Sequence, residues 1–110
     1  MKVAIIGSRS LTIEDFAPYL PQQTSEIVSG GARGIDRCAR RYAEKNQIPI
    51  TEFLPEYALY GRSAPIRRNL KIIAYCDLVI AFWDGASNGT RFVIDCCRKQ
   101  GKPIRIYLKK

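Results

Sequence analysis

The residues best suited to chemistry lie in one octapeptide, Ser29 to Asp36, which combines three glycines with an arginine. The octapeptide follows the apolar pair Ile27-Val28 and precedes a charged segment typical of a helix. A glycine-rich turn between a strand and a helix directs unpaired backbone N–H groups toward one point. Glycine also lets a ligand approach the backbone closely, and Arg33 adds a planar cation suited to phosphate or carboxylate. The octapeptide therefore predicts a site for an anionic ligand, and we expect a nucleotide.

Two further glycine-rich segments follow apolar runs, Gly7-Ser8-Arg9-Ser10 and Asp84 to Thr90. Hydroxyl and guanidinium groups in such turns suit phosphate or ribose, and a hydroxyl at a helix start also serves as an N-cap. The loops predict these ligand-binding residues: Gly7, Ser8, Arg9, Ser29, Gly30, Gly31, Arg33, Gly34, Asp36, Trp83, Asp84, Gly85, Ser87, Gly89 and Thr90.

Several of these residues also have a purely structural interpretation. The glycines of the octapeptide can simply form a tight turn, and Arg33 can pair with Asp36 or a nearby glutamate. Asp36 lies in a first helical turn, where the helix dipole stabilises a carboxylate; it can fix the loop by a hydrogen bond or bind a ribose hydroxyl. Trp83 can stack on a base or cover the edge of the core. Tyr57 and Tyr60 belong either to a lid over the site or to a packed surface loop.

The chain contains no histidine. This excludes Ser–His and Cys–His nucleophiles, histidine zinc sites and imidazole acid–base catalysis. Any catalysis would have to use carboxylates, Lys, Arg, Tyr, Cys or hydroxyl groups, with Asp84 and Asp36 as the candidates, and we expect no metal and no required cofactor beyond a nucleotide-like ligand. The four cysteines lack zinc-ligand spacing, and two of them, Cys96 and Cys97, are adjacent. We expect reduced, partly buried thiols.

The formal net charge is +8. Such a surface attracts polyanions, so the excess is either a solvated cationic surface or a nucleic-acid interface. No apolar run approaches the roughly 20 residues of a membrane span, and the first residues do not resemble a signal peptide. We therefore expect no membrane association and a cytoplasmic location. The basic residues cluster in three places: Arg37, Arg40 and Arg41; Arg67, Arg68 and Lys71; and residues 99–110.

Apolar runs alternate with helical patterns along the chain, which predicts a single α/β domain over residues 1–110. We expect a Rossmann-like three-layer architecture with about five parallel strands in the order 3-2-1-4-5, which would bring all three glycine-rich loops to one edge. Predicted strands span 3–6, 26–29, 50–54, 78–82 and 104–108. Predicted helices are a short one after a capping box at 12–15, then 34–46, 64–75 and 90–100. Residues 55–64 are predicted to be the longest irregular stretch.

Five segments in this order resemble the SMF/Lonely-Guy (SLOG) superfamily, and in particular its small stand-alone YspA/cpYpsA-related members. They are Gly7-Ser8-Arg9, Ser29 to Asp36, Arg68-Asn69, Asp77 to Phe82, and Gly89-Thr90. The resemblance covers nearly the whole chain and implies a Rossmann-like domain whose glycine-rich loops bind nucleotides or their derivatives. It also implies that Arg68 and Asn69 face the ligand, although both would otherwise suit a solvated helix face.

Two branches of the superfamily imply competing functions. The DprA (DNA-processing protein A) branch binds single-stranded DNA and is similar here at the octapeptide and around Arg68-Asn69. The Lonely-Guy branch hydrolyses nucleoside 5′-monophosphates, but Val93 stands where its glutamate is expected, and only Asp84, Asp95 or Asp36 could replace that carboxylate.

We therefore expect a nucleotide or ADP-ribose-like binding protein, with a sensor or processing role. The alternatives are a Lonely-Guy-type phosphoribohydrolase and a DprA-like single-stranded nucleic-acid binder. A homo-oligomer through helical faces is a further expectation, in which Phe92, Cys96 and Cys97 are either contacts between copies or buried residues.

Overall fold

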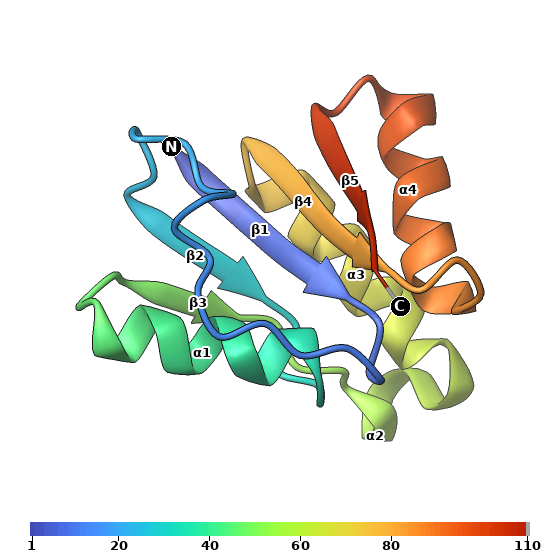
Figure 1. The fold of residues 1–110 in the computed structure, drawn as a ribbon. Coiled ribbons are helices and arrows are strands. Elements are labelled where there is room, and N and C mark those ends of the chain that lie inside the picture. The colour runs from blue at the N-terminus through green and yellow to red at the C-terminus, as the bar shows by residue number, and fades with distance from the viewer. Residues whose placement is uncertain (110) are drawn as a thin grey trace.

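Five parallel strands form one sheet with helices on both faces (Figure 1), which confirms the predicted fold class. The computed structural model describes residues 1–109. The sheet order is β3-β2-β1-β4-β5, as the sequence predicts. The strands span Lys2–Gly7 (β1), Glu26–Ser29 (β2), Ile50–Glu52 (β3), Leu78–Trp83 (β4) and Ile104–Leu108 (β5).

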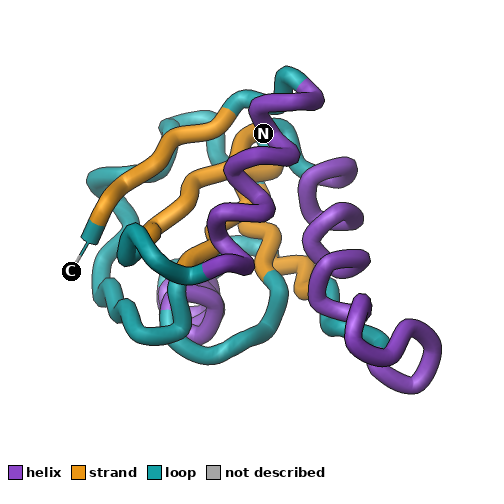
Figure 2. The backbone as a smooth tube through the Cα atoms, turned by 90° about the vertical axis from the view of Figure 1, so that its right-hand side faces the viewer, coloured by secondary structure: helices purple, strands orange, loops and turns teal. Residues whose placement is uncertain are grey.

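Helix α1 covers one face of the sheet, and α3 and α4 cover the other (Figures 1 and 2). Pro65 lies in the first turn of α3. Backbone N–H groups in a first turn make no hydrogen bond within the helix, so a residue without an N–H fits there. Helix α4 ends at Gln100, and the next residue, Gly101, has a left-handed backbone conformation that suits glycine. The helices span Ile35–Lys45 (α1), Tyr57–Tyr60 (α2), Ala64–Tyr75 (α3) and Asn88–Gln100 (α4), with a 3₁₀ turn at Gly61–Ser63.

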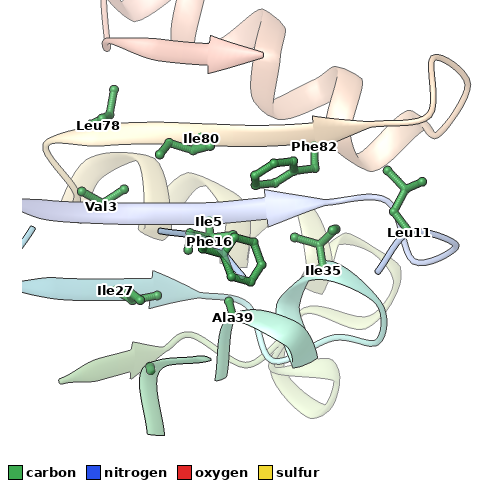
Figure 3. Close-up of a cluster of buried hydrophobic side chains, with 11 residues drawn as sticks. Val3, Ile5, Leu11, Phe16, Ile27, Ile35, Ala39, Leu78, Ile80 and Phe82 are labelled. Carbon is green, nitrogen blue, oxygen red and sulfur yellow. The ribbon is translucent and has the colours of Figure 1, made fainter. Parts of the chain in front are cut away.

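Strand β4 is apolar along its whole length and β1 is apolar from Val3 to Ile6, because both faces of the sheet are covered there. Alternate side chains of β1 therefore enter two separate cores: Val3 and Ile5 pack on the α1 side, whereas Ala4 and Ile6 pack against α3 and α4. Figure 3 shows the first of these clusters. Two buried faces fix the register of β1 and hence the position of its carboxyl end.

The helix predicted after the capping box at 12–15 is wrong, because residues 8–25 contain no helix. The Asp15 carboxylate accepts a hydrogen bond from the N–H of Ala17 at 2.9 Å, a local turn that competes with helix formation. Pro18 and Pro21 prevent a helix from continuing. The segment instead buries Phe16, whose ring packs edge-on against Phe82 at 5.5 Å (Figure 3).

Residues 55–64 are not the longest irregular stretch, because α2 and the 3₁₀ turn occupy most of it. The four cysteines are free thiols, as predicted. Cys97 is fully buried in the core, so its predicted role as a surface contact between copies is wrong; Phe92 and Cys96 also pack partly against that core. Over residues 1–109, none of the helices combines the length and apolarity that crossing a bilayer requires.

Candidate functional site

A pocket of about 380 Å³ lies where the carboxyl ends of the neighbouring strands β1 and β4 meet. From β1 the chain continues to β2 on one side, and from β4 to β5 on the other, so the pocket occupies the switch point of the sheet. Its walls come from the loop after β1, the start of α1, α3, and the start of α4. The lining residues are Ile6, Gly7, Ser8, Arg9, Ser10, Ala32, Asp36, Pro65, Arg68, Asn69, Ile72, Asp84, Ser87, Gly89, Thr90 and Val93.

A chain of hydroxyl contacts joins the loop after β1 to the loop after β4. The Ser8 and Ser87 hydroxyl oxygens are 2.6 Å apart, and the N–H of Asp84 donates to Ser8 Oγ at 3.1 Å. The N–H of Ser8 donates to the carbonyl of Phe82 at 3.0 Å. Ser8 is only 2% exposed, and these contacts hold the two loops together beside the pocket.

Asp84 anchors the loop before α4. Its Oδ1 accepts hydrogen bonds from the N–H groups of Ala86 at 2.9 Å and Ser87 at 2.8 Å, and the Ser10 hydroxyl donates to Oδ2 at 3.3 Å. The two backbone donors lower the pKa of Asp84 to about 2. The carboxylate therefore stays ionised at neutral pH and is a weak proton acceptor.

The first turn of α4 opens onto the pocket. Ser87 is its N-cap residue but makes no side-chain capping bond, because its hydroxyl contacts Ser8 and, at 3.4 Å, Thr90 Oγ1. The first N–H groups of a helix have no partner within the helix, so they remain available to an anion. Gly89 and Thr90 line the pocket, and open space surrounds the position where a side chain on Gly89 would begin.

Two buried side chains of opposite charge, one on α3 and one on α1, each hydrogen-bond to the backbone of the octapeptide. Arg68 is 8% exposed and donates through Nη1 to the carbonyl of Gly30, while Asp36, 7% exposed, accepts from the N–H of Ala32 at 3.1 Å. A Cβ on Gly30 would collide with the Arg68 guanidinium, so glycine is required for this approach. Asp36 thus fixes the loop, as one interpretation of the sequence expected.

Burial dominates the protonation of this pair. It raises the pKa of Asp36 to about 6, against the lowering effects of the Ala32 N–H and the Arg68 charge. Burial also lowers the pKa of Arg68, although the nearby Asp36 opposes that shift. Asp36 is therefore a carboxylate at the pocket that titrates close to neutral pH.

Gly34 has a packing role. Its φ of 71° lies in a region that favours glycine, and a Cβ there would lie 2.5 Å from the carbonyl oxygen of Arg9. The start of α1 therefore touches the backbone of the loop after β1 directly. Gly31 also has a positive φ of 71°, and a Cβ on it would collide with Leu54.

A second, smaller pocket of about 260 Å³ adjoins the first and shares Arg9, Ala32 and Arg68 with it. Four arginines and an exposed tyrosine ring surround it, and Arg33 lines it without a salt bridge among the described residues. Its lining residues are Arg9, Gly30, Gly31, Ala32, Arg33, Arg37, Pro55, Tyr57 and Arg68.

Four of the predicted ligand residues line neither pocket: Ser29, Gly34, Trp83 and Gly85. Ser29 is fully buried, and its hydroxyl is the one buried side-chain polar atom of residues 1–109 without a partner. Trp83 donates through Nε1 to the carbonyl of Ser87 at 3.1 Å and so supports the loop before α4. Gly85 forms the turn of that loop with a φ of 85°.

The apolar lining of the larger pocket was not predicted from the sequence. Pro65 and Ile72 lie on α3 three and four residues away from the predicted Arg68, so helical spacing could have found them. Ala32 lies within the octapeptide, and Ser10 follows Ser8 and Arg9 in one loop. Ile6 carries no such signal, because it resembles any other core residue of β1.

The sheet order and the pocket at its switch point define a Rossmann-like α/β domain. The sequence profile described as DNA recombination-mediator protein A matches residues 1–55, half of the chain. The chain belongs to this family. Gene 61 protein of Mycobacterium phage D29 is 33% identical to it over 84 residues, which cover 71% of this chain and 67% of the phage protein. No solved structure matches the chain.

Proposed function

We propose that the protein binds a nucleotide at the switch-point pocket, with the phosphate on the first turn of α4. Gly89 and Thr90 line the pocket together with Ser8, and no side chain caps the N–H groups of this helical turn; this arrangement carries the proposal. Arg9 adds a positive charge to the same wall. The volume of about 380 Å³ falls within the range of roughly 300–1,000 Å³ that small-ligand sites occupy.

Binding without turnover is the function that these residues support best. Val93, which stands at the position of the expected glutamate, is 2% exposed and lines the pocket with an apolar side chain. Asp84 is held as a weak base by two backbone donors. A phosphoribohydrolase would have to rely on Asp36, whose raised pKa suits proton transfer. The other carboxylate that lines the pocket is that of Asp84.

Replacing Gly89 tests the position of the phosphate. Gly89→Asp places a carboxylate in the first turn of α4, where the helix dipole favours it, so the fold is retained. The same charge repels a phosphate, and we expect nucleoside 5′-monophosphate affinity to fall at least about tenfold, equivalent to about 1.4 kcal/mol. Isothermal titration with the monophosphates and the matching nucleosides measures this difference.

Gly89→Ala is the matched control, because open space surrounds this position and alanine favours the helix. It should bind nucleotide like the unmodified protein. Equal affinity of Gly89→Asp and Gly89→Ala for the monophosphates would refute phosphate binding at α4. Release of free base during the titration would instead favour the hydrolase.

Single-stranded nucleic acid is a second candidate ligand, which the family description and the arginines of the smaller pocket favour. A strand that pairs phosphates with these arginines releases counterions, so its affinity must fall steeply with salt. Arg33→Ala should weaken binding of a fluorescent oligonucleotide and reduce the magnitude of the salt slope by about 1. Arg98→Ala, at the far end of α4, should leave the slope unchanged. Salt-independent binding would exclude this candidate.

The finer assignment to the small stand-alone YspA/cpYpsA-related members is part of this proposal. It is supported by the segments of the sequence that resemble those members at the two pockets, from Gly7-Ser8-Arg9 to Gly89-Thr90.

A further inference from the structure

Helix α3 presents hydrogen-bond donors to the larger pocket. Arg68 Nε donates to Asn69 Oδ1 at 2.8 Å, so this oxygen faces the guanidinium and the amide Nδ2 carries two free donors. Neither Asn69 Nδ2 nor Arg68 Nη2 has a partner among the described residues, and neither is a buried unpaired atom. Since both residues line the pocket, the α3 wall offers unpartnered side-chain donors.

The donors are held in place by the backbone. Arg68 Nη1 donates to the carbonyl of Gly30 and, at 3.5 Å, to that of Phe53, so the buried guanidinium cannot turn freely. Through its Nε contact it also fixes the direction of the Asn69 amide. A rigid pair of donors discriminates between ligands, because a ligand donor placed against it would leave both groups unpaired.

The pocket floor beside this wall is apolar. Ile6, Ile72 and Val93 are 5%, 1% and 2% exposed, and each lines the pocket. Ile72 lies one helical turn beyond Arg68 on α3, so the floor and the donor wall adjoin. A flat aromatic ring resting on this floor would present an edge to the donors.

We infer that the base read by this pocket is a 6-oxopurine, guanine or hypoxanthine, through its O6 and N7 acceptors. Guanine shows two acceptors on this edge, whereas adenine shows one acceptor and the N6 amino donor. Asn69 is then the specificity-determining residue, and Arg68 positions it and contributes the second donor. The inference rests on the proposed function, because it assigns the base of the same nucleotide.

Titration with GMP, IMP and AMP tests the inference, because all three carry the same phosphate and ribose. GMP and IMP should bind with similar affinity, and AMP at least about tenfold more weakly, as a bidentate contact discriminates against the wrong base. 7-Deaza-GMP, which lacks the N7 acceptor, should bind more weakly than GMP. AMP binding as tightly as GMP would overturn the inference and leave phosphate binding intact.

Asn69→Asp provides the matched variant. The new carboxylate can keep its contact with the Arg68 guanidinium, but it replaces the Nδ2 donors with an acceptor. Any repulsion of the phosphate affects GMP and AMP alike, so the ratio of their affinities isolates the base. We expect the preference for GMP to disappear or invert; an unchanged ratio would overturn the role of Asn69.

The nucleosides separate this inference from the proposed function. Guanosine binding more tightly than adenosine, with no gain from a 5′-phosphate, would retain the base assignment and refute the phosphate site. Tighter binding of the nucleotides than of the nucleosides, with no difference between guanine and adenine, would retain the phosphate site and refute the base assignment. No binding of any nucleotide or nucleoside would refute both.

Discussion

Gly34→Ala is expected to destabilise the folded protein by about 4 kcal/mol, as the sum of backbone strain and steric overlap. Gly34 has φ 71° and ψ −125°, a conformation that residues with a Cβ avoid. The added methyl would lie 2.5 Å from the carbonyl oxygen of Arg9, which is backbone and cannot simply rotate away. Either the loop after β1 or the start of α1 must move.

Urea-induced unfolding of both forms measures this change. Gly101→Ala is the control, because Gly101 has the same φ of 71° but nothing within 4 Å of an added Cβ. That variant bears only the left-handed strain, about 1–2 kcal/mol. Comparable losses at the two positions would show that the approach of Arg9 to Gly34 has no energetic importance.

Strands β1 and β4 could be predicted because burial on both sheet faces leaves an apolar run, and the strand order could be predicted because strands alternate with helices along the chain. β2, α3 and β5 begin and end at the predicted residues. Residues 8–25 could not be predicted, because a capping-box pattern is a local signal. The conformation of this segment depends on the burial of Phe16 between the sheet and α1. No residue near Phe16 in the sequence indicates that burial.

The pocket could be predicted to the level of its loops, since parallel strands end at one edge. The role of each residue within a loop could not. Gly30 makes room for the guanidinium of Arg68, which is 38 residues away, and Gly34 makes room for Arg9, so both depend on tertiary approach. The donor wall likewise required the orientation of Asn69, which only its contact with Arg68 defines.

Asp36→Asn is expected to stabilise the protein at pH 7 by up to about 3 kcal/mol, since each unit of pKa shift corresponds to about 1.36 kcal/mol. The pKa of Asp36 rises from 3.8 to about 6 on folding, so the native state binds its proton more tightly than the unfolded state. Stability from this group is therefore full below about pH 4 and is lost as the pH rises through 6. An asparagine avoids that loss, and its Oδ1 can still accept from the Ala32 N–H.

Unfolding measured at pH 4, 5, 6 and 7 should show a difference between the two forms that grows with pH. Asp95→Asn, an exposed substitution of the same kind on α4, is the control. A loss of stability in Asp36→Asn at pH 7 would contradict this prediction. It would mean that the attraction between the carboxylate and the buried Arg68 guanidinium outweighs the free-energy penalty of burying the carboxylate.

Nucleotide binding by the same variant decides what the carboxylate does in the pocket. Asp36 lines the pocket, so removing its charge should strengthen the binding of an anionic ligand, and most at pH 7, where the carboxylate is ionised. Weaker binding to the more stable variant would instead show that Asp36 accepts hydrogen bonds from the ribose hydroxyls. The protein would then retain a destabilising carboxylate because its ligand requires one.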